Sequence, residues 1–170
     1  GIVSLNGTER ETNSTGWASW IFSYDVPNTY LFRAVAVRDP TGYVTVGMPR
    51  SLNVTVTWTE LKISSYIISK RYVNVNDTIT IIGTLVWAHN GTPVIGGVMS
   101  LNNTISCTNE SGVAIFNVSE AKAGEYKYVM SPVKDSTGHI TKGSSIQLPF
   151  ITWTALRIDK MIWDKDFVNI

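Results

Sequence analysis

Residues 56–63, VTWTELKI, return almost unchanged as ITWTALRI at residues 151–158, a separation of 95 residues (151 minus 56). A second pair of segments keeps nearly the same spacing. GIVSLNGTERETNSTGWASW at 1–20 aligns with GVMSLNNTISCTNESGVAIF at 97–116, an offset of 96 (97 minus 1). Self-similarity that holds its register over fifty or so residues indicates a repeat architecture.

This periodicity divides the chain into three parts. We expect residues 1–57 to be the C-terminal part of one repeat, residues 58–152 a complete repeat, and residues 153–170 the first strands of a third. We therefore expect the chain to be a segment of a longer array. Alternatively, residues 153–170 of one chain could add strands to residues 1–57 of another chain. In that arrangement no segment would supply the counterpart of residues 78–87.

The complete repeat reads as a series of short β-strands. Residues 78–87, TITIIGTLVW, alternate large apolar residues with threonines, which predicts one face on a core and one polar face. The apolar face of segment 112–119 is Ala114, Phe116 and Val118, and its counterpart in the first part is Ala18, Trp20 and Phe22. The other predicted strands are 61–66, 71–75, 98–102, 104–108, 126–133 and 145–153. This pattern is typical of an all-β sandwich.

Three stretches carry a family resemblance: GTPVIGGVMSL (91–101), TNESGVAIF (108–116) and GEYKY (124–128). They resemble the bacterial and archaeal immunoglobulin-like repeats, and equally the carboxypeptidase-regulatory or transthyretin-like sandwiches of surface proteins. The resemblance implies an all-β fold of tandem immunoglobulin-like β-sandwich repeats of about 95 residues. Such modules form stalks, S-layer proteins, adhesins and spacers of secreted enzymes, so the resemblance is specific for fold and says little about function.

Charge and motifs exclude several function classes. Lys plus Arg number 14 and Asp plus Glu 13, without a basic cluster, which argues against nucleic acid as a partner. No apolar run is long enough to span a membrane. No phosphate loop, zinc-ligand spacing or nucleophile elbow is present, so we expect neither a cofactor nor an enzyme. The single cysteine, Cys107, cannot form an intrachain disulfide, and we expect it to be a buried or half-buried strand residue.

The number of N-glycosylation sequons indicates in which cellular compartment the protein is found. The chain holds more N-x-S/T sequons than its composition would give by chance, and we predict N-linked glycans on them. The candidate asparagines are Asn6, Asn13, Asn53, Asn76, Asn90, Asn102, Asn109 and Asn117. The excess favours an extracellular or cell-surface location.

Three tryptophans, Trp17, Trp58 and Trp153, are candidates for contacts. Alternation predicts that Trp20 points inward and Trp17 outward, which makes Trp17 the best candidate for contact with another subunit or a glycan. Trp58 and Trp153 recur where one repeat ends and the next begins, and we expect them to pack at that junction. Sugar stacking is the alternative role for this pair.

Two further pairs recur in register. Tyr30 and Tyr126 begin equivalent strands and resemble the tyrosine corner, in which the hydroxyl bonds nearby backbone. Asp39 and Asp135 open Asp-x-Thr-Gly turns. One carboxylate per turn is too few for calcium, so we interpret both as hairpin turns and predict no metal site.

The sequence thus favours a structural repeat segment of a glycosylated extracellular protein, such as an S-layer, stalk or filament, that forms an extended rod or lattice. Its expected partners are neighbouring repeats and other copies of the same protein. Two alternatives stay open: an adhesin or carbohydrate-binding module that uses Trp17, and a spacer of a large secreted enzyme.

Overall fold

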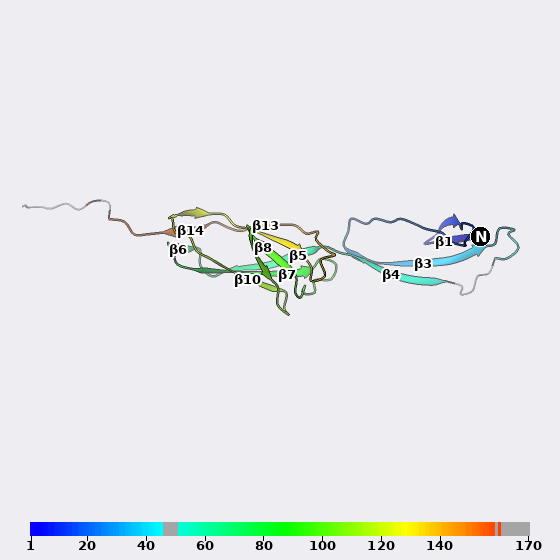
Figure 1. Cartoon of the computed structure of the whole chain (residues 1–170), viewed down its shortest axis with the longest axis horizontal. Coiled ribbons are helices and arrows are strands. Elements are labelled where there is room, and N and C mark those ends of the chain that lie inside the picture. Colours follow the sequence, from blue (N-terminus) through cyan, green and yellow to red (C-terminus); the bar gives the residue numbers. More distant parts are fainter. Residues whose placement is uncertain (46–50, 159, 161–170) are drawn as a thin grey trace, which may run out of the picture.

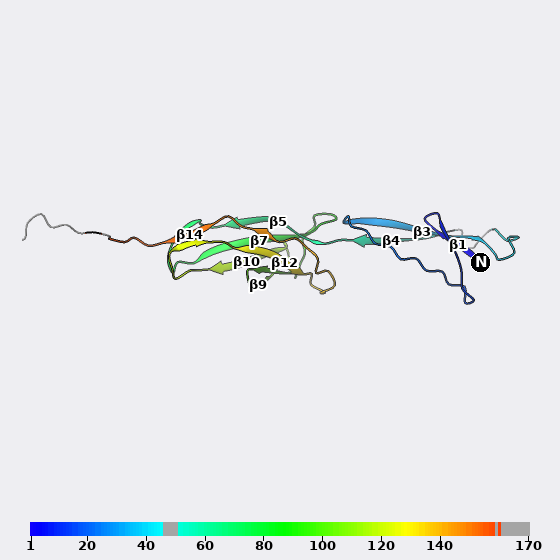
Figure 2. The same ribbon diagram turned by 90° about the horizontal axis from the view of Figure 1, so that it is seen from above.

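The computed structural model describes residues 1–45, 51–158 and 160. Its regular structure is entirely β, with no helix in the described part of the chain. Figures 1 and 2 show two bodies that lie end to end along the long axis, with β1–β4 in one and β5–β14 in the other. We call residues 1–58 the N-terminal sheet and residues 59–154 the sandwich.

The strand bounds agree closely with the alternation pattern. The N-terminal sheet holds β1 (Ile2–Leu5), β2 (Thr8–Glu11), β3 (Asn28–Arg38) and β4 (Leu52–Trp58). The sandwich holds β5 (Leu61–Ile68), β6 (Tyr72–Asn74), β7 (Ile79–Trp87), β8 (Val98–Leu101), β9 (Thr104–Cys107), β10 (Val113–Val118), β11 (Gly124–Tyr126), β12 (Val129–Lys134), β13 (Ile146–Gln147) and β14 (Ile151–Thr154). Every strand predicted within the complete repeat is present, although two of them are divided.

The sandwich consists of two facing sheets. One has the order β10-β7-β5, and the other is built from the ladders β11-β14-β6 and β13-β12-β8-β9. The two ladders are continuous because β11 leads into β12 and β13 into β14, with a 2.9 Å bond from the Leu148 N–H to the Tyr128 carbonyl at the break. The opening strand is split between the sheets, since β5 pairs with β7 while β6 runs parallel to β14. This arrangement is an immunoglobulin-like β-sandwich.

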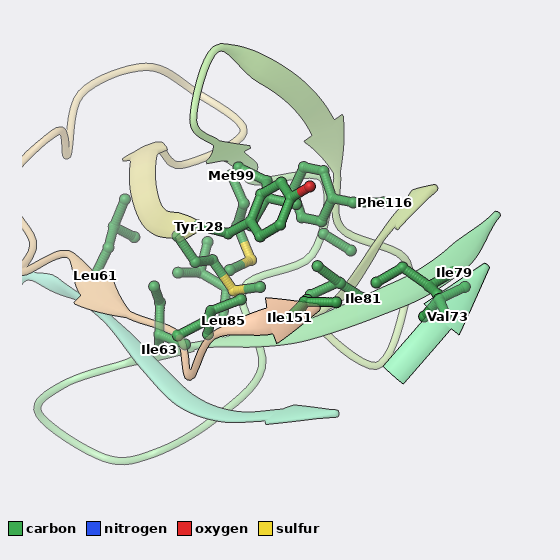
Figure 3. Close-up of a cluster of buried hydrophobic side chains, with 14 of the residues drawn as sticks. Leu61, Ile63, Val73, Ile79, Ile81, Leu85, Met99, Phe116, Tyr128 and Ile151 are labelled. Atoms are coloured by element: carbon green, nitrogen blue, oxygen red, sulfur yellow. The ribbon is translucent and has the colours of Figure 1, made fainter. Parts of the chain in front are cut away.

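The core lies between the two sheets (Figure 3). β7 supplies an inward row in which Ile79, Ile81 and Leu85 are at most 1% exposed, as the alternation predicts. Met99 and Met130 are fully buried as well. Burial of this apolar surface stabilises the sandwich by about 25 cal/mol for each Å² removed from water.

Gly83 interrupts the inward row of β7. A Cβ atom at this position would lie 2.4 Å from the Met130 Sδ and 2.8 Å from the Met99 Cε. Because protein interiors are close-packed, the glycine and the two methionines share one volume. A side chain at Gly83 would require the methionines to move.

The N-terminal sheet repeats half of the sandwich. Its order is β2-β1-β3-β4, which matches β9-β8-β12-β13. The register matches too: Leu5 pairs with Thr8 and Ala34, at the positions where Leu101 pairs with Thr104 and Met130.

Residues 17–22 align with β10, yet residues 17–24 form no strand. In the sandwich β10 pairs along its whole length with β7. Among the described residues, 1–58 include no counterpart of β7, and a strand needs a neighbour to satisfy its backbone groups. Of the predicted face, Ala18 and Trp20 are nevertheless half-buried against the sheet, whereas Phe22 is 36% exposed.

Two sequence predictions are wrong. Cys107 is exposed rather than buried, because it ends β9, an edge strand of its sheet. Trp153 does not open a third repeat: β14 runs to Thr154, and the indole is fully buried in the core of the sandwich. Residues 155–158 have no regular structure, and most of the predicted third part, 159 and 161–170, lies outside the described residues.

Candidate interaction surface

The side of the N-terminal sheet that corresponds to the sandwich interior is uncovered in the described structure, and we call it the open face. It carries a groove of about 390 Å³. The groove is lined by Leu5, Ala18, Ser19, Trp20, Phe22, Phe32, Val54, Val56 and Trp58. Val56 is 38% exposed, whereas its counterpart in the sandwich, Ile151, is fully buried. The open face therefore presents core-type side chains to solvent.

An aromatic cluster occupies the end of the open face that lies toward the sandwich. Tyr24 stacks on Tyr30 with ring centroids 3.9 Å apart, and its edge meets Trp58 at 4.9 Å. Phe22 lies 4.9 Å from Phe32, which is only 3% exposed. Such contacts add stability beyond the area they bury. They explain how residues 17–24 stay on the sheet without strand pairing.

Trp17 and Trp20 lie as alternation predicts. Trp17 is 75% exposed, and its backbone is fixed because the Asn13 carboxamide oxygen accepts its N–H at 2.9 Å. Trp20 turns toward the sheet, where its Nε1 is buried without a hydrogen-bond partner. Trp17 is thus an exposed aromatic side chain on a fixed turn and does not line the groove of the open face.

The repeated tyrosines behave as tyrosine corners. The Tyr30 hydroxyl donates to the Val26 carbonyl, and the Tyr126 hydroxyl donates to the Lys122 carbonyl, both at 3.0 Å and four residues upstream. Each bond fixes the loop that precedes the strand on which the tyrosine lies. The structural interpretation made from sequence is confirmed for both residues.

Trp58 and Trp153 occupy equivalent places inside their own units, so the expected packing between consecutive sandwiches is wrong for Trp153. Its ring meets Tyr126 edge-on at 5.6 Å, and its Nε1 donates to the Asp77 carbonyl at 3.4 Å. Trp58 is half-buried in the aromatic cluster. Both side chains come from the last strand of a unit, and alternation aims them at that unit's interior. Full burial of Trp153 also leaves no face for sugar stacking.

The two aspartate turns are built alike. In the second, Asp135 accepts hydrogen bonds from the Thr137 hydroxyl at 2.5 Å and from the Ile140 N–H at 2.9 Å. In the first, Asp39 accepts equivalent bonds from Thr41 and Val44. The threonine hydroxyl is the main cause that lowers the pKa of each carboxyl below its ordinary value. Both carboxylates serve the turn, and the described residues contain no group of three acidic, His or Cys side chains able to hold a metal ion.

One buried hydroxyl escaped the sequence analysis. The Tyr128 hydroxyl donates to the Glu120 carboxylate at 2.9 Å, and burial, followed by this bond and the charge of Glu120, raises the pKa of Tyr128. In the N-terminal sheet the corresponding pair is Phe32 and Tyr24, which make ring contacts instead. The sequence did carry a signal for this pair, since both aligned positions change together between the two units: Tyr128 and Glu120 in one, Phe32 and Tyr24 in the other.

All eight sequon asparagines are exposed. Several use their carboxamide in local structure: Asn102, in a left-handed conformation with φ of 51°, accepts the Val129 N–H, and Asn6 accepts the Arg33 N–H in the same way. Asn6 also donates through Nδ2 to the Leu31 carbonyl at 3.2 Å. Asn13 and Asn90 instead accept from the hydroxyl of the threonine in their own sequon, at 2.8 Å.

Comparison with solved structures finds domains of intimin. The chain overlaps a structure of the D00-D0 domain with a TM-score of 0.47 and 15% identity, covering 90% of this chain and 78% of that one. For a structure of the D0-D1 domain the TM-score is 0.45 and the identity 18%, with 91% and 77% covered. No family model matches the chain. The fold assignment above therefore rests on the strand order of this chain itself. In the described part of the chain, no helix is long and apolar enough to cross a membrane.

Proposed function

We propose that this chain is a structural segment of a glycosylated extracellular surface protein, in which immunoglobulin-like sandwiches follow one another as an extended rod. S-layer, stalk and filament proteins are the classes of surface protein that match this description. The observation that carries the proposal is the short, bonded joint between the N-terminal sheet and the sandwich (Figure 2).

Only Thr59 and Glu60 separate β4 from β5. The Glu60 carbonyl accepts the Ala88 N–H at 3.0 Å, and the next N–H, that of Leu61, donates to the Lys142 carbonyl at 2.8 Å. The Thr59 hydroxyl lies 2.8 Å from the His89 Nδ1. A joint without glycine or proline that is bonded in this way holds direction, unlike a flexible linker. It suits a protein that must span distance.

The exposed asparagines support the extracellular part of the proposal. Glycans at these positions would lie on turns and outward strand faces, where they hinder edge-to-edge pairing with other molecules. Neighbouring sandwiches and further copies of the protein are the partners of such an array.

Two measurements test the proposal. Small-angle X-ray scattering should give the chain the profile of a rod, and insertion of Gly-Gly-Ser-Gly between Thr59 and Glu60 should shorten the mean end-to-end distance. An unchanged profile would show that the joint is already flexible and would contradict the rod. Glycopeptide mass spectrometry of the native protein should find glycans on the sequon asparagines, and unmodified asparagines throughout would contradict the glycosylated surface protein.

Trp17 favours a second function, that of an adhesin or carbohydrate-binding module. Its indole is 75% exposed on a turn whose backbone is fixed by Asn13, and an exposed indole face suits stacking on a sugar ring. Glycan-array binding that is lost in Trp17→Ala and kept in Ile21→Ala, a change at a neighbouring residue that is 97% exposed, would support it. No binding by the unmodified chain would refute it.

A further inference from the structure

The outer face of the sheet β10-β7-β5 carries a row of three isoleucines. Strand register places Ile82 of β7 directly opposite Ile115 of β10 and Ile67 of β5. Because the alternate residues of β7 are buried in the core, Ile82 and its two neighbours point outward. Ile67 is 61% exposed and Ile115 is 52% exposed, while Ile82 between them is half-buried. We call this row and the outward positions beside it the isoleucine face, which comprises Ser65, Ile67, Thr80, Ile82, Thr84, Val113, Ile115 and Asn117.

The isoleucine face holds no charged residue. Its polar side chains bond to one another: the Ser65 hydroxyl donates to the Thr84 hydroxyl at 3.0 Å, and the Thr80 hydroxyl donates to the Asn117 carboxamide oxygen at 3.1 Å. In contrast, β11 and β12 of the facing sheet each carry an exposed charged side chain. Polar groups that already have partners lose less when water is removed from them. Another surface can therefore cover the isoleucine face without stranding a charge.

The isoleucine face is complementary to itself. A two-fold axis that lies in the plane of contact above Ile82 sets the isoleucine row of one molecule on the same row of another. The uncharged flanks then meet without repulsion between like charges. Sheets pack face to face in this manner, with their apolar side chains interdigitated. The occupant that matches the face is therefore a second copy of this chain.

The size of the isoleucine face sets the strength of such a contact. Three strands spaced about 4.8 Å apart, over about five residues each, cover on the order of 300 Å². A stable complex buries about 800 Å² on each partner. A single pair of sandwiches should therefore associate weakly. Where sandwiches follow one another along a rod, several such faces act together, and their combined affinity rises steeply.

Asn117 is placed to regulate this contact. It is an exposed sequon asparagine on the same face, two residues along β10 from Ile115. Thr80 engages its carboxamide oxygen, whereas Nδ2, the atom that would carry an N-linked glycan, takes no part in that bond. Packed sheets lie only about 10 Å apart, so a glycan at this position would hold the second sheet away.

We propose that the isoleucine face is a lateral contact with a second copy of this chain, and that a glycan on Asn117 prevents this contact. The inference rests on the proposed function, because it names the surface through which neighbouring copies of the surface protein meet. The two can fail separately. A flexible joint would contradict the rod and leave the contact intact, whereas an isoleucine face that binds no second copy would leave the rod intact.

The test measures amide chemical shifts of the full chain, made in a host that attaches no glycans, over a series of protein concentrations. We expect concentration-dependent shifts in β5, β7 and β10. The double variant Ile67→Ser with Ile115→Ser should weaken the association at least about tenfold. Asn117→Lys should weaken it as well, because the two-fold axis brings like charges together. Ile105→Ser is the matched control, since Ile105 is 70% exposed on β9 of the other sheet, and it should leave the association unchanged.

Two outcomes would overturn the contact. The first is a set of chemical shifts that does not depend on concentration. The second is a set of shifts in β3 and β4 that is lost in Val54→Ser and kept in the double isoleucine variant, which would assign the association to the open face.

A second arm tests the regulation by Asn117 in a host that attaches N-linked glycans. The chain that carries a glycan on Asn117 should stay monomeric at concentrations where the bare chain associates, and Asn117→Gln from the same host should associate again. Equal association with and without this glycan would overturn the regulation. So would a bare Asn117 in native protein whose other sequons carry glycans, an outcome that keeps the glycosylated surface protein of the proposed function.

Discussion

Gly83→Ala tests whether one glycine and two methionines share a single volume in the core. The new Cβ would lie 2.4 Å from the Met130 Sδ, and overpacking of this kind costs about 1–3 kcal/mol. Removing a glycine from the unfolded chain offsets about 0.4–1 kcal/mol of that cost. We therefore expect Gly83→Ala alone to lower the free energy of unfolding by roughly 1–2 kcal/mol.

Met130→Ala should lower the free energy of unfolding by about 2–5 kcal/mol, because a fully buried side chain leaves a cavity. In the double variant the main clash is gone and the added methyl group fills part of the cavity. The double variant should therefore be more stable than the sum of the two single effects predicts, by at least about 1 kcal/mol.

Urea unfolding of the full chain, followed by far-ultraviolet circular dichroism, measures all four members of the cycle. Ile115→Ala is the matched control, since Ile115 lies on β10 with its side chain 52% exposed, and its effect should add to that of Met130→Ala. Additivity of Gly83→Ala and Met130→Ala within about 0.5 kcal/mol would refute the shared volume.

Three further predictions concern single side chains. Tyr126→Phe removes the bond to the Lys122 carbonyl and should lower the free energy of unfolding by about 1 kcal/mol; no change in urea midpoint would mean that the corner does not hold its loop. Asp135→Asn should destabilise the sandwich at pH 7, because the folded carboxylate has a lowered pKa. The stability it contributes is present above the unfolded pKa of about 4 and is lost as pH falls through the lower folded pKa, so the difference from the unmodified chain should shrink steadily as pH falls below about 4; a difference independent of pH would contradict the role of the charge. Cys107, exposed at the end of an edge strand, should react with a maleimide in the folded protein as fast as in urea, and protection in the folded state would contradict its placement.

Sequence alternation and repetition predicted the strands well. β7 and β10 bury the faces that their patterns indicate, because alternation in a strand follows directly from backbone geometry. Cys107 was misjudged because a local pattern does not say whether a strand lies at the edge or the centre of a sheet. Trp153 was assigned to a junction because its motif spans two units, while its burial depends on partners such as Tyr126 in the same unit.

The open face was beyond prediction for a different reason. Residues 17–22 carry the same alternation as β10, yet they form no strand. A segment forms a β-strand only when it hydrogen-bonds to a neighbouring strand, and the local sequence does not specify that neighbour. The volume relation between Gly83 and its two methionines likewise became visible only once β7, β8 and β12 were placed in space.

The parallel pairing of β6 with β14 gives the sandwich a mechanical property. The chain enters the sandwich through β5 and β6 and leaves it through β14, and the ladder joins Tyr72, Val73 and Asn74 to Thr152, Trp153 and Thr154. Tension applied through the two ends draws these parallel strands in opposite directions along their length. The hydrogen bonds of the ladder are then loaded together in shear, and they must break together instead of unzipping one by one. Since unfolding under load is governed by the unfolding rate, this ladder resists the load together with the β5–β7 pairing through which the chain enters the sandwich.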